Sequence, residues 1–342
     1  MRKTLLLFLL LLPIAMHGQT GFRIVEYNCE NFFDCEHDSL KEDQMFLPQS
    51  PRRWTRHRFW QKLQAVSKVI VSMSHHGAPP DVVALTEVEN DTVMTYLTRR
   101  ALLGSLGYRY VMTRSPDPRG MNVALLYQTG TFRLLNSKSL SVDFGPLQEK
   151  PTRDVLYVSG KTYLGDTLHL FVCHFSSKLN GRKATEHYRC AEAQTVMHAI
   201  DSIRKTSPLC NLIVLGDFNE TPREKAVKEV LHTQELDSLR INPACLYNMA
   251  ENIKKSERIA GTYRYEGAWE MLDQMIVSGT LLNNTQQMHT QPSFFHIHAP
   301  KFLLQTDDVY SGEKPFRTYN GYRYQGGFSD HLPIFLDLVE KK

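Results

Sequence analysis

Two acidic residues follow short apolar runs that are predicted to be buried strands. Glu87 ends the run in PPDVVALTEVEN, and Asp217 ends the run in CNLIVLGDFNETP. Ligand sites in α/β sheets lie at the carboxyl ends of strands, so these two acids could meet around a hard cation. Asp217 and Asn219 are two residues apart, and in extended backbone their side chains point the same way. A carboxylate beside a carboxamide is suited to holding water against a phosphoryl oxygen.

Three further polar residues interrupt apolar runs. Asn28 ends the run in RIVEYN, His174 ends the run in LFVCH, and Asp273 lies inside MLDQMIVS. Each has a structural alternative: a turn cap for Asn28, a hydrogen-bonded core histidine for His174, and a solvent-facing edge position for Asp273. A buried carboxylate is costly without a partner, so Asp273 favours a nearby histidine whose tautomer it would fix.

Asp330 and His331 stand just before the last apolar run, in GGFSDHLPIFLDLV. Taken alone, this pair is typical of a turn before an edge strand, because Asp bonds to local backbone and Pro333 tolerates only a strand start or an edge. Its importance depends on which other residues the fold brings to the same place.

The elements that must position these residues alternate between strands and helices. A helix is expected from an N-cap at Thr55, with an apolar stripe that includes Phe59 and Leu63, and a second from Lys183 to Arg204. Continuous apolar strands such as VVAL and LIVL are expected to be covered on both faces. Strands are predicted near Phe22–Tyr27, Asp81–Thr86, Tyr108–Thr113, Val123–Tyr127, Val155–Ser159, Leu168–His174, Asn211–Gly216, Leu272–Val277 and Pro333–Val339.

The first 20 residues differ from the rest of the 342-residue chain. Arg2 and Lys3 precede an apolar run from Leu5 to Met16 and then small and polar residues, which is the pattern of a secretory signal peptide. Residues 1–20 are therefore expected to be an export signal and 21–342 one domain, with no other segment long enough to span a membrane. A periplasmic or extracellular location follows as an expectation.

Composition restricts the partners only weakly. Loss of Arg2 and Lys3 lowers the formal charge from +4 to +2, so a basic surface for a polyanion would have to be local. Six cysteines in an exported chain permit disulfides. A bridge between Cys29 and Cys35 is one possibility, and several buried free thiols are the other.

Taken in order, Asn28, Glu87, GDFN, LDQMIVS and SDHLP resemble the motifs of the endonuclease/exonuclease/phosphatase family, which includes deoxyribonuclease I and exonuclease III. The resemblance covers almost the whole of residues 21–342. It implies an α/β four-layer sandwich, with two mixed β-sheets packed face to face and flanked by helices. It also implies a phosphoesterase that uses Mg²⁺ or Mn²⁺.

The resemblance assigns a role to each matching residue. Glu87 corresponds to the main metal ligand, with Asn28 and Asp330 completing the metal site. Asp217 corresponds to the residue that orients or deprotonates the attacking water, and Asn219 to the one that positions the phosphate. His331 corresponds to the histidine on the scissile phosphate, with Asp273 as its orienting partner. His174 corresponds to the second catalytic histidine of the deoxyribonuclease I branch.

One position departs from that branch. The acid expected to orient the second histidine is replaced by Asn122 in RGMNVALLY, and an amide does not stabilise the histidine cation as a carboxylate does. Asp117, in SPDPRG, is an alternative partner for His174.

Several stretches could bind a phosphate backbone. HFSSKLNGRKATEHYR directly follows the strand ending at His174 and supplies Lys178 and Arg182, while Arg153 lies in the short TRD motif. The segment PRRWTRHRFWQK is also basic, and KPFRTYNGYRYQGGF adds aromatic residues on which bases could stack. The alternative for the basic stretches is an ordinary solvated charged surface. The alternative for KPFRTYNGYRYQGGF is a structured loop that covers the end of a sheet.

The sequence therefore predicts a secreted, divalent-metal-dependent phosphodiesterase, and specifically a nuclease whose substrate is nucleic acid. The protein is expected to be a monomer without a stable membrane anchor, and no protein partner is inferred. The alternative is a phosphatase or a phospholipase C-like or sphingomyelinase-like enzyme on the same scaffold. The chain lacks the signature of inositol polyphosphate phosphatases and the long apolar hairpin with which sphingomyelinases are expected to dock on membranes. Both absences make this alternative less favoured than a nuclease. A third hypothesis, a silent binding module, conflicts with the presence of Glu87, Asp217, Asn219, Asp273 and His331.

Overall fold

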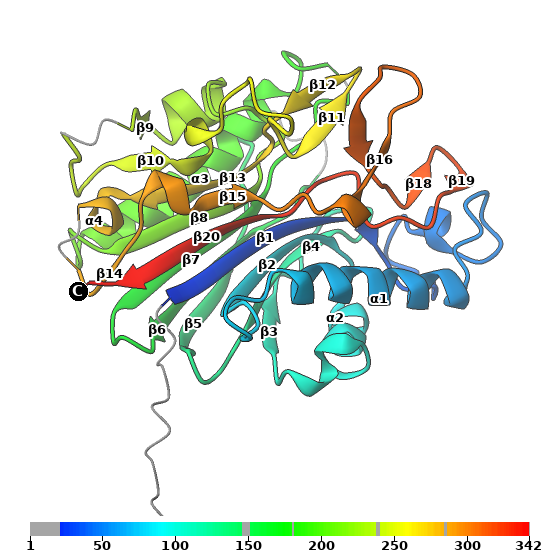
Figure 1. Ribbon diagram of the computed structural model, residues 1–342, viewed down its shortest axis with the longest axis horizontal. Helices are drawn as coiled ribbons and strands as arrows, with labels where there is room; N and C mark the ends of the chain where they lie inside the picture. The colour runs from blue at the N-terminus through cyan, green and yellow to red at the C-terminus, as the bar shows by residue number, and fades with distance from the viewer. Residues whose placement is uncertain (1–20, 146–150, 180, 237–239, 284–285, 342) are drawn as a thin grey trace, which may run out of the picture.

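Two mixed sheets, each of seven strands, form the centre of the structure (Figure 1). The computed structural model describes residues 21–145, 151–179, 181–236, 240–283 and 286–341. The predicted export signal, residues 1–20, lies outside this range.

The first sheet has β1 at its centre, parallel to β2 and antiparallel to β20. Its order is β14 (Met288–His289), β20 (Ile334–Glu340), β1 (Gly21–Phe32), β2 (Val82–Val88), β4 (Asn122–Tyr127) and β3 (Arg109–Met112), with β15 (Phe295–Ile297) also paired to β20.

The second sheet has β8 at its centre, parallel to β7 and antiparallel to β13. Its order is β5 (Phe132–Leu140), β6 (Val155–Thr162), β7 (Thr167–His174), β8 (Asn211–Asp217), β13 (Asp273–Ser278), β10 (Leu246–Asn248) and β9 (Thr233–Gln234). Three two-stranded pairs lie outside both sheets: β11 (Tyr263–Tyr265) with β12 (Ala268–Glu270), β16 (Leu304–Thr306) with β17 (Glu313–Pro315), and β18 (Tyr319–Asn320) with β19 (Arg323–Tyr324).

Helices cover the outer face of each sheet. Among the described residues, the α-helices are α1 (Arg56–Ser72), α2 (Asp91–Arg99), α3 (Glu186–Arg204) and the single turn α4 (Gly279–Leu282), and short 3-10 helices and a π-helix at Ala226–Val230 lie between other elements. One apolar core joins α1 and α2 to the first sheet, a second lies between the sheets, and a third joins α3 to the second sheet. Strands buried on both faces explain the continuous apolar runs VVAL and LIVL. The predicted four-layer α/β sandwich is confirmed.

The predicted elements are found with small shifts in their bounds. Thr55 is the N-cap of α1, and its hydroxyl accepts a hydrogen bond from the Arg58 amide at 3.4 Å. The second helix begins at Glu186 rather than Lys183. The edge strand β5 was not predicted, because much of its length is exposed and FRLLNSKSL lacks the continuous apolar run of a central strand.

All six cysteines are free thiols, and Cys29 is buried without a bond to Cys35. Of the two possibilities that the sequence left open, the structure therefore has buried free thiols and not a Cys29–Cys35 disulfide. Among the described residues, no helix combines the length and apolar character needed to cross a membrane.

Gly216 sits at the end of β8, where two strands approach closely. Its φ of +142° is strained for other residues, and an added Cβ would lie 1.9 Å from the Cys173 carbonyl oxygen of β7. We expect Gly216→Ala to lower the free energy of unfolding by about 3 kcal/mol, through backbone strain and overpacking. Urea unfolding measures this. Gly130→Ala is the control, because an added Cβ there meets nothing within 4 Å; equal losses in both variants would contradict the prediction.

Candidate active site

Seven of the predicted site residues meet at one end of the two sheets: Asn28, Glu87, His174, Asp217, Asn219, Asp273 and His331. Asn28 lies in β1, Glu87 in β2, His174 ends β7 and Asp217 ends β8. The pairing register places His174 beside Asp217 on one side and Asp273 beside Asp217 on the other. Because that register is fixed by backbone hydrogen bonds along three strands, the relative positions of these residues are set by the sheet rather than by a flexible loop.

Local backbone irregularities direct two of these side chains. Glu87 has a φ of +59° and lies where the β2–β4 register shifts, between Leu85 and Val88. Asn219 has a φ of +48° directly after β8. Bulges and left-handed residues turn side chains away from the regular alternation of a strand, at a cost of about 1–3 kcal/mol each, and they concentrate at functional sites.

A buried carboxylate–histidine pair forms the centre of the site. His331 Nδ1 lies 2.6 Å from Asp273 Oδ2, and His331 Nε2 lies 3.9 Å from Asp217 Oδ2. Burial alone would lower the pKa of His331, but the charges of Asp273 and Asp217 outweigh it and raise this pKa well above its usual value. His331 is therefore a cation held between two carboxylates. It is the histidine partner that the buried position of Asp273 predicted.

Glu26 is a further buried acid beside this pair, and sequence reasoning missed it. Burial, followed by the charges of Asp273 and Asp217, raises its pKa well above the usual range. A side-chain hydrogen bond with Asp273 contributes to the same shift, because a protonated Glu26 carboxyl can donate to that carboxylate. The signal was present in RIVEYN, where an acid stands inside an apolar strand as Asp273 does in MLDQMIVS.

Asn28 lies between the two acids that end central strands. Its side-chain amide donates to Asp217 Oδ2 at 3.0 Å and to Glu87 Oε1 at 3.4 Å. Glu87 Oε2 accepts from the Asn31 amide at 2.7 Å. Burial, opposed by the charge of His331, raises the pKa of Asp217 to about 7. Asp217 is thus poised near neutral pH to gain or lose a proton.

Asn219 is fixed against Asp217. Its backbone amide donates to Asp217 Oδ1 at 2.8 Å, and its side-chain nitrogen donates to the Phe175 carbonyl at 3.0 Å. The same nitrogen lies 3.3 Å from Asp217 Oδ2. The two side chains therefore face one point. The left-handed backbone at Asn219, rather than the extended backbone assumed from the two-residue spacing, brings them together.

His174 is held as a neutral ring. Burial lowers its pKa well below the usual value, and the positive charges of Arg153 and Arg119 add to this. Its Nε2 lies 3.7 Å from Glu87 Oε1 and 3.8 Å from Asp217 Oδ2. A neutral imidazole at this position can donate a hydrogen bond to phosphate oxygen.

Neither proposed partner orients His174. The Asn122 side chain bonds instead to Thr113, the Ser115 amide and the Glu89 carbonyl. Asp117 pairs with Arg153 at 3.4 Å. Among the described residues, His174 Nδ1 is a buried nitrogen without a partner.

Asp330 lies next to His331 but faces a different partner. Its Oδ2 forms an ion pair with Arg317 at 2.9 Å, and its charge helps to raise the pKa of His331. The adjacent Ser329 hydroxyl donates to the Asn28 carbonyl at 2.7 Å and accepts from the His331 amide. These bonds fix the SDH turn against β1.

The predicted substrate-binding cations are engaged with the protein itself. Lys178 and Arg182 both pair with Glu224, at 3.1 and 2.6 Å. Arg153 is buried and donates to the Phe175 carbonyl at 2.9 Å. It lines a hollow of about 390 Å³ next to the site, together with Asp117, Arg119, Phe144, Ser176 and Tyr188. Arg153 therefore connects this hollow to the strand end that carries His174.

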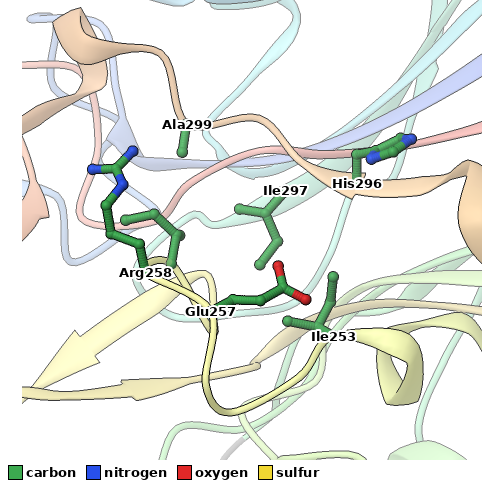
Figure 2. Close-up of a pocket in the computed structure, with 7 residues that line it drawn as sticks. Ile253, Glu257, Arg258, His296, Ile297 and Ala299 are labelled. Carbon is green, nitrogen blue, oxygen red and sulfur yellow. The ribbon is translucent and has the colours of Figure 1, made fainter.

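A second hollow of about 430 Å³ contains none of the catalytic residues. It is lined by Ile253, Glu257, Arg258, Ile259, His296, Ile297 and Ala299 (Figure 2). Figure 2 shows the Glu257 carboxylate between Ile253 and Ile297, with Arg258 and His296 on opposite sides. The hollow includes residues of β15 rather than the strand ends that carry Asp217 and Glu87.

The donor set fits a hard divalent cation. Glu87 and Asp217 offer carboxylate oxygens at one point, which is the ligand chemistry of Mg²⁺ or Mn²⁺. The Asn28 amide turns its nitrogen toward both acids, and its oxygen accepts a hydrogen bond from the Glu30 amide at 2.9 Å. Ligand atoms of Asp217, Asp273 and His331 also lie within 4.8 Å of one another. Asp273 and His331 already satisfy each other at 2.6 Å, so we assign this trio to proton chemistry and place the cation nearer Glu87.

Two face-to-face sheets, with buried acids and histidines at their common end, define a phosphoesterase-type α/β sandwich. The chain belongs to the Endonuclease/Exonuclease/phosphatase family, whose sequence model matches residues 23–341. Members of this superfamily are phosphoesterase hydrolases. No curated protein sequence matches the chain significantly.

Solved structures share the fold at low sequence identity. A family member from Bacteroides vulgatus is 15% identical, with a TM-score of 0.56 over 94% of this chain and 100% of that one. TDP2 from D. rerio, complexed with single strand DNA product, is 14% identical, with a TM-score of 0.56 over 94% and 99%. The human nocturnin catalytic domain with bound sulfate is 17% identical, with a TM-score of 0.53 over 94% and 95%.

Asp273 is expected to be essential for turnover because it holds the His331 cation. Asp273→Asn should lower kcat roughly 10²–10⁴-fold, the contribution typical of one acid–base group. Hydrolysis of bis(p-nitrophenyl) phosphate with Mg²⁺ or Mn²⁺ measures this. Asp201→Asn, on the exposed side of α3, is the matched control. Similar kcat values for the two variants would refute the role given to Asp273.

Arg189 and Glu220 form a buried ion pair at 2.8 Å beneath the loop that carries Asn219. Arg189→Met leaves the Glu220 carboxylate without this partner, so we expect the free energy of unfolding to fall by about 3–5 kcal/mol. The double variant R189M/E220Q should recover much of that loss. Urea denaturation tests both, and a double variant no more stable than the single one would argue against the ion-pair explanation.

Proposed function

We propose that this protein is a divalent-metal-dependent phosphodiesterase that hydrolyses nucleic acid. The observation that carries the proposal is the buried group of Asp217, Asp273 and His331, with Asn219 fixed against Asp217 at 2.8 Å. This group offers a proton acceptor, a held cation and an amide at one point. Phosphoryl transfer needs those three contributions.

The protonation states of Asp217, His331 and His174 suggest a role for each in the reaction. Asp217 accepts a proton from the attacking water as the water oxygen bonds to phosphorus and the bond to the leaving oxygen breaks. The His331 cation and the neutral His174 donate hydrogen bonds to phosphoryl oxygens, where negative charge develops. Asn219 orients the phosphate. A divalent cation held by Glu87, with Asn28 and Asp330 nearby, would supply Lewis-acid stabilisation of the phosphate and leaving oxygen.

Two considerations support nucleic acid as the substrate class. TDP2, which shares the fold, has been solved with a single-strand DNA product. The chain also carries two arginine-rich and aromatic segments, residues 50–61 and 316–327. The second bonds to Glu30 and Asp330 beside the site, and the first bonds to the second through Arg52 and Tyr319. Export to the periplasm or beyond, directed by residues 1–20, is part of the same proposal and rests on the signal-like pattern.

Removal of the metal is expected to stop the reaction. EDTA should abolish hydrolysis of DNA, RNA and bis(p-nitrophenyl) phosphate, and Mg²⁺ or Mn²⁺ should restore it. Glu87→Gln should raise the Mg²⁺ concentration needed for half-maximal rate at least tenfold, since it removes one negative ligand. Turnover that persists after chelation would exclude a metal-dependent mechanism.

A substrate panel distinguishes the proposed class from its alternative. Hydrolysis of DNA or RNA above phosphomonoesters and choline phospholipids supports a nuclease. Preference for either of the latter would instead establish a phosphatase or a phospholipase C-like enzyme on this scaffold.

A further inference from the structure

Two basic stretches far apart in sequence form one surface beside the site. Residues 50–61 lead into α1, and residues 316–327 contain β18 and β19; Figure 1 shows the two side by side. The Tyr319 hydroxyl donates to the Arg52 carbonyl at 3.0 Å. The Trp54 and Tyr319 ring centroids lie 5.9 Å apart. We call this the arginine–tyrosine surface; its members are Arg52, Arg53, Arg56, Arg58, Tyr322, Arg323 and Tyr324, with the buried Tyr319 ring packed beneath them.

Its inner members are held in place by the protein. Arg58 Nη1 donates to the carbonyls of Arg52 and Arg53 at 2.6 and 2.9 Å, and its guanidinium lies 4.4 Å from the Tyr324 ring centroid. The Arg52 guanidinium lies 5.4 Å from the Tyr319 ring centroid. Cation–π stacking of this kind restricts the side chains, so less entropy is lost when an anion binds.

The charge of this surface is not neutralised. Within the described parts of the chain, none of its five arginines forms an ion pair with a carboxylate, and neither stretch contains an acidic residue. By contrast, Lys178 and Arg182 share Glu224. Uncompensated arginines close together are expected to attract a polyanion, because each phosphate bound releases counterions.

The arginine–tyrosine surface is joined directly to the catalytic residues. Glu30, two residues after Asn28, accepts hydrogen bonds from the Thr318 and Tyr319 amides at 2.6 and 3.2 Å. Arg317 pairs with Asp330 at 2.9 Å. A chain whose phosphate lies at Asp217 and His331 would therefore meet this surface as it leaves the site.

Tyr322 indicates which polyanion the surface fits. It stands in the turn between β18 and β19 and is 63% exposed, with Arg323 exposed next to it. An exposed aromatic ring among arginines is the arrangement on which unpaired bases stack while the backbone is neutralised. Bases paired inside a duplex do not present their faces in this way.

We propose that the arginine–tyrosine surface binds the single-stranded polynucleotide that flanks the scissile phosphate. The inference rests on the proposed phosphodiesterase function and deepens it. If the surface binds the flanking strand, the preference of the enzyme for a polynucleotide over a small phosphodiester depends on residues outside the catalytic group.

The test compares a polymer with a small phosphodiester in the same enzyme. The triple variant R53Q/R56Q/R323Q removes three exposed charges and keeps similar side-chain volume. With Mg²⁺, its kcat/KM for a fluorescent 20-nucleotide single-stranded oligonucleotide should fall at least tenfold near 100 mM salt. Log kcat/KM should also depend less steeply on log salt, by about 2 units for three contacts. Tyr322→Ala should lower kcat/KM roughly tenfold through loss of base stacking.

Hydrolysis of bis(p-nitrophenyl) phosphate should stay within twofold of wild type in these variants, because that substrate is too small to reach the surface. This activity also shows that the variants are folded. The matched control is R99Q/R100Q/R133Q, which removes the same charge at the end of α2 and the beginning of β5. It should leave both activities unchanged.

The outcomes separate the two proposals. If wild type hydrolyses no phosphodiester in the presence of metal, the proposed function fails. If it hydrolyses the oligonucleotide and the surface variants match the control, the single-strand inference fails while the function stands. Loss of binding to phosphatidylglycerol vesicles, with oligonucleotide kcat/KM unchanged, would overturn the inference in favour of an anionic lipid surface.

Discussion

Two carboxylates that face each other across β8 and β13 are the constraint on which the site depends. The strand register sets Asp217 opposite Asp273, and both side chains are fully buried. Like charges in a dry region are tolerated only if a cation or a proton compensates them. His331 supplies the positive charge at 2.6 Å from Asp273, and the raised pKa of Glu26 removes a third negative charge from the same region.

The backbone around this charge cluster departs from regular strand geometry where the chemistry requires it. Gly216 allows β8 to pass close to the Cys173 carbonyl, and Glu87 and Asn219 adopt left-handed conformations. Such conformations cost free energy that is offset by the three apolar cores of the sandwich. The rigid sheets therefore hold reactive groups in positions that an isolated loop would not maintain.

The basic residues divide into two groups by their partners. Arg189 is buried against Glu220, and Lys178 and Arg182 are shared by Glu224, so these cations support the loop between β7 and α3 and the segment after β8. Arg52, before α1, and Arg58, in its first turn, form no such ion pair among the described residues and stack on Tyr319 and Tyr324 instead. A basic motif in sequence does not reveal this division, since the neutralising acid is distant along the chain.

Continuous apolar runs and the N-cap at Thr55 predicted where strands and helices form and that the sheets are covered on both faces, whereas the four-layer arrangement was implied by the resemblance of the ordered motifs to the family. The cost of an unpaired buried charge predicted a histidine partner for Asp273, and the resemblance assigned the roles of Asp217, Asn219 and His331. Tertiary contacts establish that Asp330 pairs with Arg317, that His174 Nδ1 has no hydrogen-bond partner among the described residues, and that Glu26 lies beside Asp273. These depend on contacts between distant segments, and local periodicity carries no information about which of them meet.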